Sequence, residues 1–485
     1  MGDRIPRWRT LPELVLAAAA LRPEVPLLAE AGGRAWTAAH LAERTRCAAA
    51  VLRAAGVRAG DRVGIDIRPA TWSEVGIAYC AVSWLGAIAV LISTDETERA
   101  ARAEVGVGLV IGGAVAFEDL LAATTPVGTP PQPGPEDPLD VVFTSGTTGK
   151  PKAVVSQHSH WVGASRPEML ASRGRRVVAH TGVPIAVSGG LHGVFLNHLA
   201  RGVTSVWAPA PASLAQACAG WEVRELHLTP HAAGALAALP QPDWADGVRV
   251  VRLVGAPLPD AVRQRLAAAF PRARIASIYA LTEGGAASFV NVRDPGASSI
   301  GRPVQGTQVR VVDDRGRDVP DGHIGEIAVR ARSAPLSYLT DAGLNEESFV
   351  DGWTRTGDIG QRLPDGTIRL VGRAREQIII GGGRLSPQTV EAILARKLPP
   401  ETEFAVAGMQ ATGRSDAIVV FLVGVAGSAR TEDVRRTLLA LSGPFAPEHV
   451  QIVAAIPRTA LGKPLRRELL GLLGAAENAT SERSS

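Results

Sequence analysis

This chain of 485 residues has few cysteines and shows no pattern of metal ligands. Its three cysteines, Cys47, Cys80 and Cys218, lie far apart and form no CxxC pair. Such spacing predicts neither a disulfide framework nor a zinc site, and it is typical of proteins from a reducing compartment. His158 and His160 resemble a metal-binding pair, but we expect them to serve local packing or hydrogen bonds.

The chain also lacks a strong charge of either sign. It carries 51 basic and 47 acidic residues, so the net charge is only +4, and no basic stripe stands out. This balance argues against nucleic acid as a partner.

No long apolar segment runs without interruption. The stretch Val75–Ile92 contains Ser83 and Gly86, so it predicts a buried helix and strand and not a membrane span. Near the start of the chain, Leu11–Leu21 contains Glu13, which predicts a short amphipathic helix and not the apolar core of a signal peptide. We therefore expect a soluble protein of the cytoplasm.

Two familiar nucleotide-binding motifs are absent. Gly106 and Gly108 begin a GxGxxG pattern, but Ile111 occupies the position of its third glycine. A Walker A loop is also excluded, because Thr144 and Pro151 stand where that motif needs glycine and a hydroxyl residue.

A different loop, rich in hydroxyl groups, glycine and lysine, follows the expected strand Leu139–Phe143. Glycine lets backbone N–H groups come close to a ligand, and lysine adds positive charge, which together suit a polyphosphate. A polar surface loop is the alternative, because Gly, Ser and Thr are ordinary turn residues. The candidate phosphate-binding residues are Thr144, Ser145, Gly146, Thr147, Thr148, Gly149, Lys150 and Lys152.

Helix-like and strand-like segments alternate over the first 120 residues and again over 177–287, which predicts parallel sheets covered by helices. From Gly301 the strands become short and are separated by turns such as Asp365-Gly366, which favours a hairpin. Beyond Gly372, strands and helices mix. We predict an α/β fold with a large N-terminal domain (1–373) of βα subdomains plus a β-rich, barrel-like subdomain, a small mobile α+β domain (374–476) and a disordered tail (477–485).

The segment Ser277–Glu283 ends an expected strand with three chemically useful side chains. Tyr279 is able to stack on a base, Thr282 to bond a phosphate, and Glu283 to hold Mg²⁺, which prefers a carboxylate together with phosphate oxygens. A buried tyrosine and a surface glutamate are the alternative.

Three more segments lie beyond residue 350. Asp358, in Trp353–Asp358, suits both hydroxyls of a ribose, or else it forms an Asx turn. Gly372–Gln377 lies where the run of short strands ends and the mixed region of strands and helices begins. The alternative interpretation of this segment is a charged surface linker. Lys463, in Pro457–Lys463, precedes an apolar helix; taken alone, a lysine near a chain end is usually solvated.

Together these five segments, in this order, resemble the motifs of the adenylate-forming (AMP-binding) superfamily, which includes acyl-CoA synthetases, peptide-synthetase adenylation domains and luciferases. Gly56–Asp61 and Gly322–Glu326 add to the resemblance, which covers nearly the whole chain. It implies ATP-dependent conversion of a carboxylic acid to an acyl-adenylate with release of pyrophosphate, Mg²⁺ as cofactor, and transfer of the acyl group to CoA. Two alternatives stay open: an adenylating enzyme that loads a carrier-protein pantetheine or an amine, and a nucleotide-binding protein without catalysis.

The resemblance also implies roles for single residues. Lys463 would bridge the carboxylate and the α-phosphate, Glu283 would hold Mg²⁺ beside Thr282, and Arg375 would be the hinge of the small domain. The adenine and ribose would contact Gly255, Ala256, Pro257, Tyr279, Asp358 and Arg373, and the pantetheine tunnel would contain Gly381, Gly382 and Gly383.

The acid is not expected to be an α-amino acid. Peptide-synthetase adenylation domains hold the α-ammonium group with an Asp, and the matching stretch here, Val183–Gly190, contains no acidic residue. The ammonium group would therefore be buried without a partner. Val187 replaces the His or aromatic gate of many acyl-CoA synthetases, and Ala280 replaces a common glycine. We expect a neutral aryl or medium-chain acid in a pocket formed by Val187, Ser188, Gly189 and Ala280.

Overall fold

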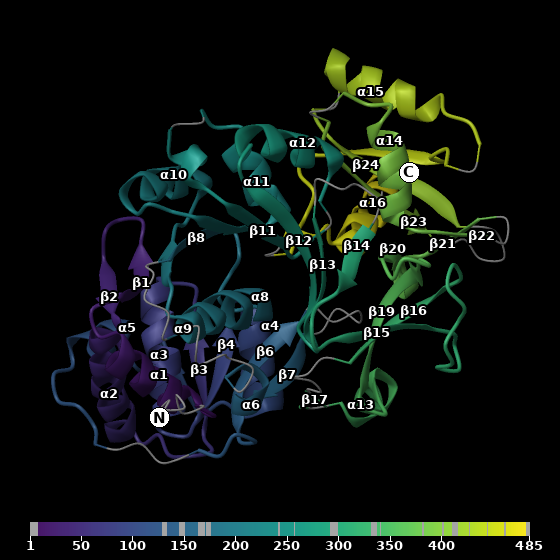
Figure 1. The fold of residues 1–485 in the computed structure, drawn as a ribbon. Coiled ribbons are helices and arrows are strands. Elements are labelled where there is room, and N and C mark those ends of the chain that lie inside the picture. Colours follow the sequence, from purple (N-terminus) through teal and green to yellow (C-terminus); the bar gives the residue numbers. More distant parts are fainter. Residues whose placement is uncertain are drawn as a thin grey trace.

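The computed structural model has an α/β architecture, with sheets covered by helices (Figure 1). It describes residues 8–128, 133–144, 151–162, 170, 176–240, 243–256, 258–291, 299–330, 337–339, 341–380, 383–399, 402–409, 416–425, 427–443, 445–459 and 462–481. Within these ranges no helix is both long and apolar enough to cross a membrane.

The largest sheet joins parallel and antiparallel strands in one continuous path. Across the sheet its strands are β15 (Gln308–Val312), β16 (Ile324–Arg330), β19 (Trp353–Arg362), β20 (Ile368–Arg373), β14 (Ser299–Pro303), β13 (Gly285–Asn291), β12 (Arg274–Leu281), β11 (Val250–Val254), β10 (Glu225–Leu228), β8 (Val177–Thr181), β9 (Thr204–Trp207), β1 (Pro26–Glu30) and β2 (Ala35–Thr37), and β18 (Phe349–Val350) pairs with β19. The run from β12 to β1 is parallel, and the run from β12 to β15 is antiparallel. The β-rich part is thus an extension of the parallel sheet.

A second sheet lies beside the first and consists of β17 (Ser337–Tyr338), β7 (Lys152–Gln157), β6 (Pro138–Thr144), β4 (Ile88–Ile92), β3 (Arg62–Asp66) and β5 (Leu109–Ile111). Its central strands are parallel, as the alternation of helices and strands predicts. Among the described residues up to position 270, the helices and helical turns are α1 (Leu11–Leu21), α2 (Ala38–Ala54), α3 (Trp72–Trp84), α4 (Asp95–Ala100), η1 (Ala101–Val105), α5 (Phe117–Ala122), α6 (His158–Trp161), α8 (Ser188–Gly190), η2 (Leu191–Leu196), α9 (Asn197–Arg201), α10 (Pro211–Gly220), α11 (Pro230–Ala237), η3 (Asp243–Gly247) and α12 (Asp260–Ala269).

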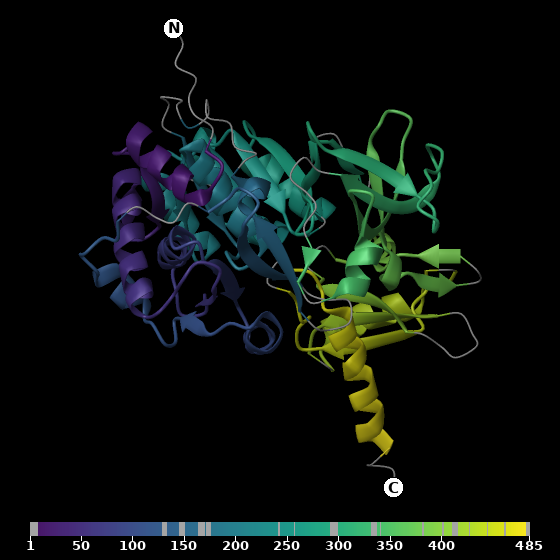
Figure 2. The same ribbon diagram turned by 90° about the horizontal axis from the view of Figure 1, so that it is seen from below.

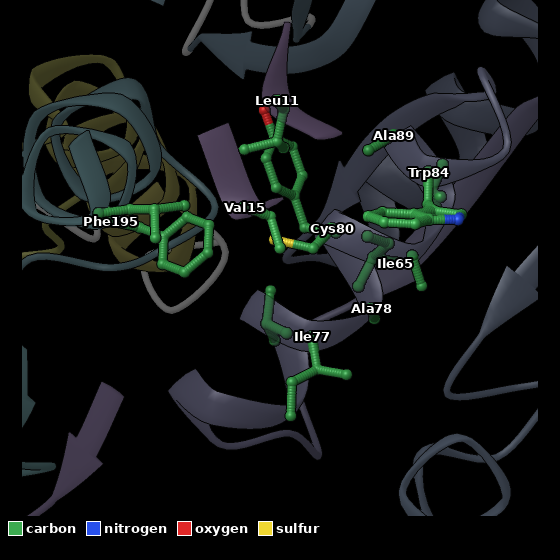
Figure 3. Packing of buried hydrophobic residues seen from close by; sticks show 14 of the residues in the cluster. Leu11, Val15, Ile65, Ile77, Ala78, Cys80, Trp84, Ala89 and Phe195 are labelled. Carbon is green, nitrogen blue, oxygen red and sulfur yellow. The ribbon is translucent and has the colours of Figure 1, made fainter. Parts of the chain in front are cut away.

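Helix α3 forms the centre of the main hydrophobic core. It begins with a capping box in which Thr71 and Glu74 bond to each other's backbone N–H groups. Nearly all of its residues are buried, and Figure 3 shows its side chains among those of α1, β3 and η2. Gly76 is required here, because an added Cβ would lie 2.9 Å from the ring of Phe195. The buried helix and strand expected within Val75–Ile92 are therefore confirmed as α3 and β4.

The C-terminal part forms a smaller unit with its own core. Its elements are η4 (Ala374–Glu376), β21 (Ile378–Ile380), β22 (Gly383–Leu385), α14 (Pro387–Ala395), β23 (Phe404–Met409), β24 (Ala417–Val423), α15 (Ala429–Leu439), β25 (His449–Val453) and α16 (Arg466–Ser481), while α13 (Ala342–Ser348) precedes it. Apolar residues of α14, α15 and β24 pack together. Gly372 stands at its entry, where a Cβ would lie 2.3 Å from Ser386.

Helix α16 projects from this unit (Figure 2) and continues to Ser481. It thereby enters the segment 477–485, which we expect from the sequence to be a disordered tail. Alanine and glutamate near its end favour helix, which accounts for the continuation. Residues 482–485 lie outside the described part of the chain.

Candidate active site

A cleft of about 3180 Å³ opens where the large sheet, the second sheet and the C-terminal unit meet. Its walls include the ends of the parallel strands β6, β11 and β12, which is where ligands bind in open α/β sheets. The facing walls come from β19, β20, α14 and the loop before α16. The cleft therefore receives residues from segments that are hundreds of positions apart in the sequence.

The ends of the candidate phosphate loop lie at the cleft. Thr144 closes β6, Lys152 opens β7, and the two are paired across the hairpin and line the cleft. Ser145, Gly146, Thr147, Thr148, Gly149 and Lys150 lie outside the described residues. The Lys152 ammonium group lies 5.3 Å from the ring centre of Tyr338, a cation–π distance. Desolvation by burial, and secondarily the charge of Arg375, lower the pKa of Lys152.

Tyr279, Asp358 and Arg373 form one hydrogen-bonded group in the cleft. The Tyr279 hydroxyl donates to Oδ2 of Asp358 at 2.5 Å, and Nε of Arg373 lies 2.8 Å from its Oδ1. Asp358 and Arg373 are opposite each other on β19 and β20, so the sheet register sets their contact. Burial and the charge of Asp358 raise the pKa of Tyr279 well above 10, so the phenol stays protonated. The sequence predicts all three residues, but not that Tyr279 bonds to Asp358.

Thr282 and Glu283 lie in the turn between β12 and β13 and line the cleft. The Tyr338 hydroxyl donates to Oε1 of Glu283 at 2.8 Å. Burial, the charge of Glu283 and this hydrogen bond raise the pKa of Tyr338. Tyr338 thus orients the carboxylate, and sequence reasoning missed it because β17, the short strand that carries it, has no pattern of its own.

Gly255 and Ala256 follow β11 and also line the cleft, while Pro257 lies outside the described residues. Gly255 has φ +102°, a left-handed conformation that a side chain would strain. The glycine therefore allows the chain to turn directly after a buried strand and to present its backbone to the cleft.

Lys463 reaches the same cleft from the C-terminal unit. Its loop is held by a hydrogen bond from the Lys463 N–H to Oγ1 of Thr459 and by one from the Thr459 N–H to the Lys463 carbonyl. The neighbouring Gly462 has φ +83°, and a Cβ there would lie 3.6 Å from Cβ of His231 on α11. The loop is thus seated against the large unit.

The surroundings of Lys463 are electrostatically mixed. Although the side chain is exposed to the cleft, the walls desolvate it and lower its pKa, and Arg373 adds to the effect. Asp358, Glu376 and Glu283 act in the opposite direction. Because these charges act on one ammonium group, Lys463 shares the electrostatic environment of the other candidate residues.

Arg375 lies in η4, directly after β20, and lines the cleft. The hairpin of β21 and β22 follows, with Ile380 paired to Gly383. Gly383 is not among the residues that line the cleft, and Gly381 and Gly382 lie outside the described part of the chain. The structure therefore brings Lys463 into the cleft and leaves Gly383 away from it.

The four residues expected to form the acyl pocket, Val187, Ser188, Gly189 and Ala280, all line the cleft. Sequence reasoning missed the neighbours of Ser188: its hydroxyl lies 2.9 Å from Nδ1 of His192, whose Nε2 lies 3.0 Å from Asp140.

His158 and His160 face other partners, each accepting a backbone N–H bond at Nδ1, from Leu11 at 3.1 Å and from Gln157 at 2.9 Å. Both histidines thus serve hydrogen bonds, as expected, but only the bond of His160 is local, because Leu11 is 147 positions from His158.

No group of three His, Cys, Asp or Glu side chains able to hold a metal occurs among the described residues. Mg²⁺ does not require one, because it is commonly bound by one or two carboxylates together with phosphate oxygens and water. Glu283, held by Tyr338 near the ends of the phosphate loop, fits that mode of binding.

Comparison with known proteins agrees with this geometry. The family model "AMP-binding enzyme" matches residues 16–339. The chain is 33% identical to sulfoacetate–CoA ligase of Cupriavidus necator over 72% of this chain and 70% of that protein. It is 28% identical to 4-coumarate–CoA ligase 2 of Oryza sativa subsp. japonica over 97% of this chain and 94% of the other. The structure of o-succinylbenzoate CoA synthetase from Bacillus subtilis with its acyl-adenylate superposes with a TM-score of 0.80 at 23% identity, over 94% of this chain and 98% of that one. The five ordered segments and these matches lead to one conclusion: the chain belongs to the AMP-binding enzyme family.

Proposed function

We propose that this protein activates a carboxylic acid with ATP, releases pyrophosphate and transfers the acyl group from the adenylate to the thiol of CoA. One observation carries the proposal: Lys463 enters, from the C-terminal unit, the cleft that contains Glu283 and Asp358. Family membership supports ATP and CoA as substrates, and the names of the relatives support an acid–thiol ligase.

In the first step a carboxylate oxygen attacks the α-phosphorus of ATP, and the bond from that phosphorus to the bridging oxygen breaks, so pyrophosphate leaves with the electron pair. Two anions must approach each other, and negative charge must be offset in the transition state. Lys463 would bridge the carboxylate and the α-phosphate. Thr144 and Lys152, with the loop between them, would hold the departing phosphates.

A Mg²⁺ ion, when bound, would offset the phosphate charge, and Glu283 beside Thr282 would hold it. Asp358 would accept hydrogen bonds from the ribose hydroxyls, kept in place by Tyr279 and Arg373. The backbone at Gly255 and Ala256, with Pro257, would flank the adenine. The two carboxylates among these residues are already held in place, Asp358 by Tyr279 and Arg373 and Glu283 by Tyr338.

The second step requires CoA to reach the adenylate. We infer that the unit 374–476 rotates about Arg375 relative to residues 1–373, which withdraws Lys463 and brings Gly381, Gly382 and Gly383 to the cleft as a pantetheine tunnel. The position of Gly383 outside the cleft, just after the hinge, supports this reading. The thiolate then attacks the acyl carbon, and AMP leaves.

The acceptor has two alternatives, a carrier-protein pantetheine and an amine. A nucleotide-binding protein without catalysis would not need Lys463 in the cleft, so we place that alternative last. The pocket at Val187 and Ala280 favours an acid that is not an α-amino acid, because no acidic residue stands in Val183–Gly190 to pair with an ammonium group. We place the reaction in the cytoplasm, where its cosubstrates are abundant and the free cysteines stay reduced.

A panel of carboxylic acids, with ATP and Mg²⁺, tests the proposal. Hydroxylamine traps any acyl-adenylate as a hydroxamate, and pyrophosphate release is measured in parallel. Productive acids are then incubated with CoA, with a phosphopantetheinylated carrier protein and with amines, and the products are read by mass spectrometry. We expect hydroxamate formation followed by an acyl-CoA and AMP. An amide or an acylated carrier without acyl-CoA would replace the CoA assignment, and no hydroxamate with any acid would overturn adenylation itself.

A further inference from the structure

Two arginine side chains share one carboxylate on a face of the largest sheet. Nε of Arg252, on β11, donates to Oε1 of Glu225, on β10, and Nη2 of Arg201, at the end of α9, lies 3.5 Å from Oε2. His227 lies beside them, with its Nε2 2.7 Å from Oε1 of Glu225. Among the described residues, neither arginine forms an ion pair with a second carboxylate. The group therefore has a net positive charge, whichever protonation state His227 adopts.

The charges of this group do not disappear on burial. Burial alone would raise the pKa of Glu225, but His227 and the two arginines outweigh it and lower the pKa, so the carboxylate is ionised. Burial lowers the pKa of Arg201, and Glu225 opposes this effect. Arginine nevertheless stays protonated in proteins. One carboxylate thus offsets only one of two guanidinium charges.

Arg252 presents the remaining charge to the cleft. Arg252 and His227 line the cleft, whereas Arg201 and Glu225 do not. The Arg252 side chain is 32% exposed. Its Nε is bonded to Glu225, but its two Nη groups form no hydrogen bond within the described part of the chain. They offer four N–H donors in the planar fork that binds carboxylates and other oxyanions.

The position of Arg252 suits the far end of a bound acid. It lies two positions before Val254 on the same face of β11, because successive side chains of a strand alternate. Val254 lines the cleft beside the expected acyl pocket, since a Cβ added to Gly189 would lie 4.0 Å from the valine. Gly255, at the carboxyl end of the strand, is three positions from Arg252, or about 10 Å of extended chain. An acid that extends inward from this end of the sheet therefore approaches Arg252.

We propose that Arg252 recognises a second anionic group, a carboxylate or a sulfonate, at the far end of the acid. Such a group offsets the guanidinium charge, whereas a neutral acid would cover the Nη donors and leave them unpaired. Glu225 is a positioning residue, which holds Nε and leaves both Nη groups free. A dianionic acid replaces the neutral acid expected from the sequence. The proposal rests on the proposed function, since it requires the acid to bind in this cleft.

The test compares acids of matched shape and different charge. Succinic, glutaric, adipic and terephthalic acids are each assayed beside their monoamide and their monomethyl ester, and 3-sulfopropanoic acid is assayed beside its sulfonamide. We expect kcat/KM for pyrophosphate release with one dianionic acid to exceed that of its neutral analogues by about tenfold or more, because the analogues leave the arginine unpaired. Neutral analogues that equal or exceed the dianionic acid in every series would overturn the proposal.

Variants then assign the preference to one residue. Arg252→Gln removes the charge and should reduce the ratio of dianionic to neutral acid about tenfold. Arg252→Lys retains the charge without the fork and should keep part of the preference. Arg249→Gln changes an exposed arginine just before β11 that does not line the cleft, so this control should have the ratio of the wild type. Each ratio is measured within one protein, so a smaller folded fraction does not alter it. A ratio that Arg252→Gln leaves unchanged would contradict the assignment.

Calorimetry separates this proposal from the proposed function. Titration with the same pairs of acids, without ATP, should show tighter binding of a dianionic acid, and Arg252→Gln should remove the difference. If this result is obtained but no acid releases pyrophosphate, the recognition stands and the ligase assignment fails. Pyrophosphate release with no preference for a second anion has the reverse meaning.

Discussion

The Tyr279 hydroxyl donates to the Asp358 carboxylate at 2.5 Å and thereby joins β12, the last parallel strand, to β19 in the antiparallel part of the sheet. Asp358 is only 4% exposed, and Arg373 binds its other oxygen. Buried carboxylates need such partners, and a pair of them also fixes the direction of the lone pairs that remain. The site of the proposed ribose contact is thus set before the nucleotide arrives.

Removing this hydrogen bond should weaken ATP binding selectively. In Tyr279→Phe, Asp358 loses a donor and its orientation, so we expect the KM for ATP to rise about fivefold to tenfold and the free energy of unfolding to fall by about 1–2 kcal/mol. Steady-state pyrophosphate release and urea unfolding measure the two effects. The KM for the acid should stay unchanged; an equal rise in both KM values would mean that the tyrosine supports the whole cleft and not the nucleotide alone.

Lys463→Ala should separate the two half-reactions. Losing one cationic donor to the transition state should reduce adenylate formation by about 10²–10³-fold. Thioester formation from a chemically prepared acyl-adenylate should be largely spared, because Lys463 is proposed to leave the cleft before that step. Lys397→Ala, which changes an exposed lysine of the same unit outside the cleft, is the control and should behave as the wild type. Unchanged pyrophosphate exchange in Lys463→Ala would remove this residue from the mechanism.

Glu283 and Tyr338 should be coupled in the response to Mg²⁺. Replacing the carboxylate in Glu283→Gln should raise the Mg²⁺ concentration for half-maximal adenylation by more than tenfold, and Tyr338→Phe, which loosens its orientation, should raise it about tenfold. Activity at fixed ATP and increasing Mg²⁺ provides the measurement. If saturating Mg²⁺ does not restore adenylation activity in Tyr338→Phe, the tyrosine acts on a part of the site other than the metal.

The buried histidines should make the fold sensitive to acid. Burial lowers the pKa of His158 to about 4 and, with the charge of His227, that of His180 to about 3. The unfolded chain binds these protons near pH 6.5, so their stabilisation is present above that pH and is lost as pH falls toward the folded values. Each of these histidines should lower the free energy of unfolding by about 1.4 kcal/mol for each pH unit below 6.5, until the pH reaches its folded pKa.

A variant isolates this effect from other titrating groups. In His180→Asn, the free energy of unfolding in urea should fall less steeply between pH 7 and pH 5 than in the wild type. The difference in slope should correspond to about one proton fewer taken up on unfolding. The lower stability of the variant at pH 7 is irrelevant to the comparison, because only the change with pH is tested. Parallel curves for the two proteins would show that His180 does not take up a proton on unfolding.

Local sequence was enough to select several residues that the fold brings together in the cleft. Tyr279, Asp358 and Lys463 each lie in a short segment whose residues predict a turn or the end of a strand. The order of these segments along the chain indicated the family. The alternation of apolar segments also predicted the parallel sheets. In each case the signal depends on residues that are close together in the sequence.

Contacts between distant residues carried no such signal. Asp140 lies within an apolar strand, 52 positions before His192, and reads as an isolated charge until the fold brings the two together. Tyr338 is 55 positions from Glu283 and belongs to a strand of two residues. Strand pairing had to be known before either contact was visible, because register is set by whole sheets and not by local composition.

The closeness of Gly462 to His231, where an added Cβ would lie 3.6 Å from Cβ of the histidine, suggests an inhibitor that stops the enzyme between its two half-reactions. A compound that bridged the Lys463 loop and α11 would keep the lysine where the first half-reaction uses it and would prevent the rotation proposed for the second. Such an inhibitor would act only after pyrophosphate has left, and the protein would retain its own reactive intermediate. Each protein molecule that held the compound would therefore release one pyrophosphate and then stop.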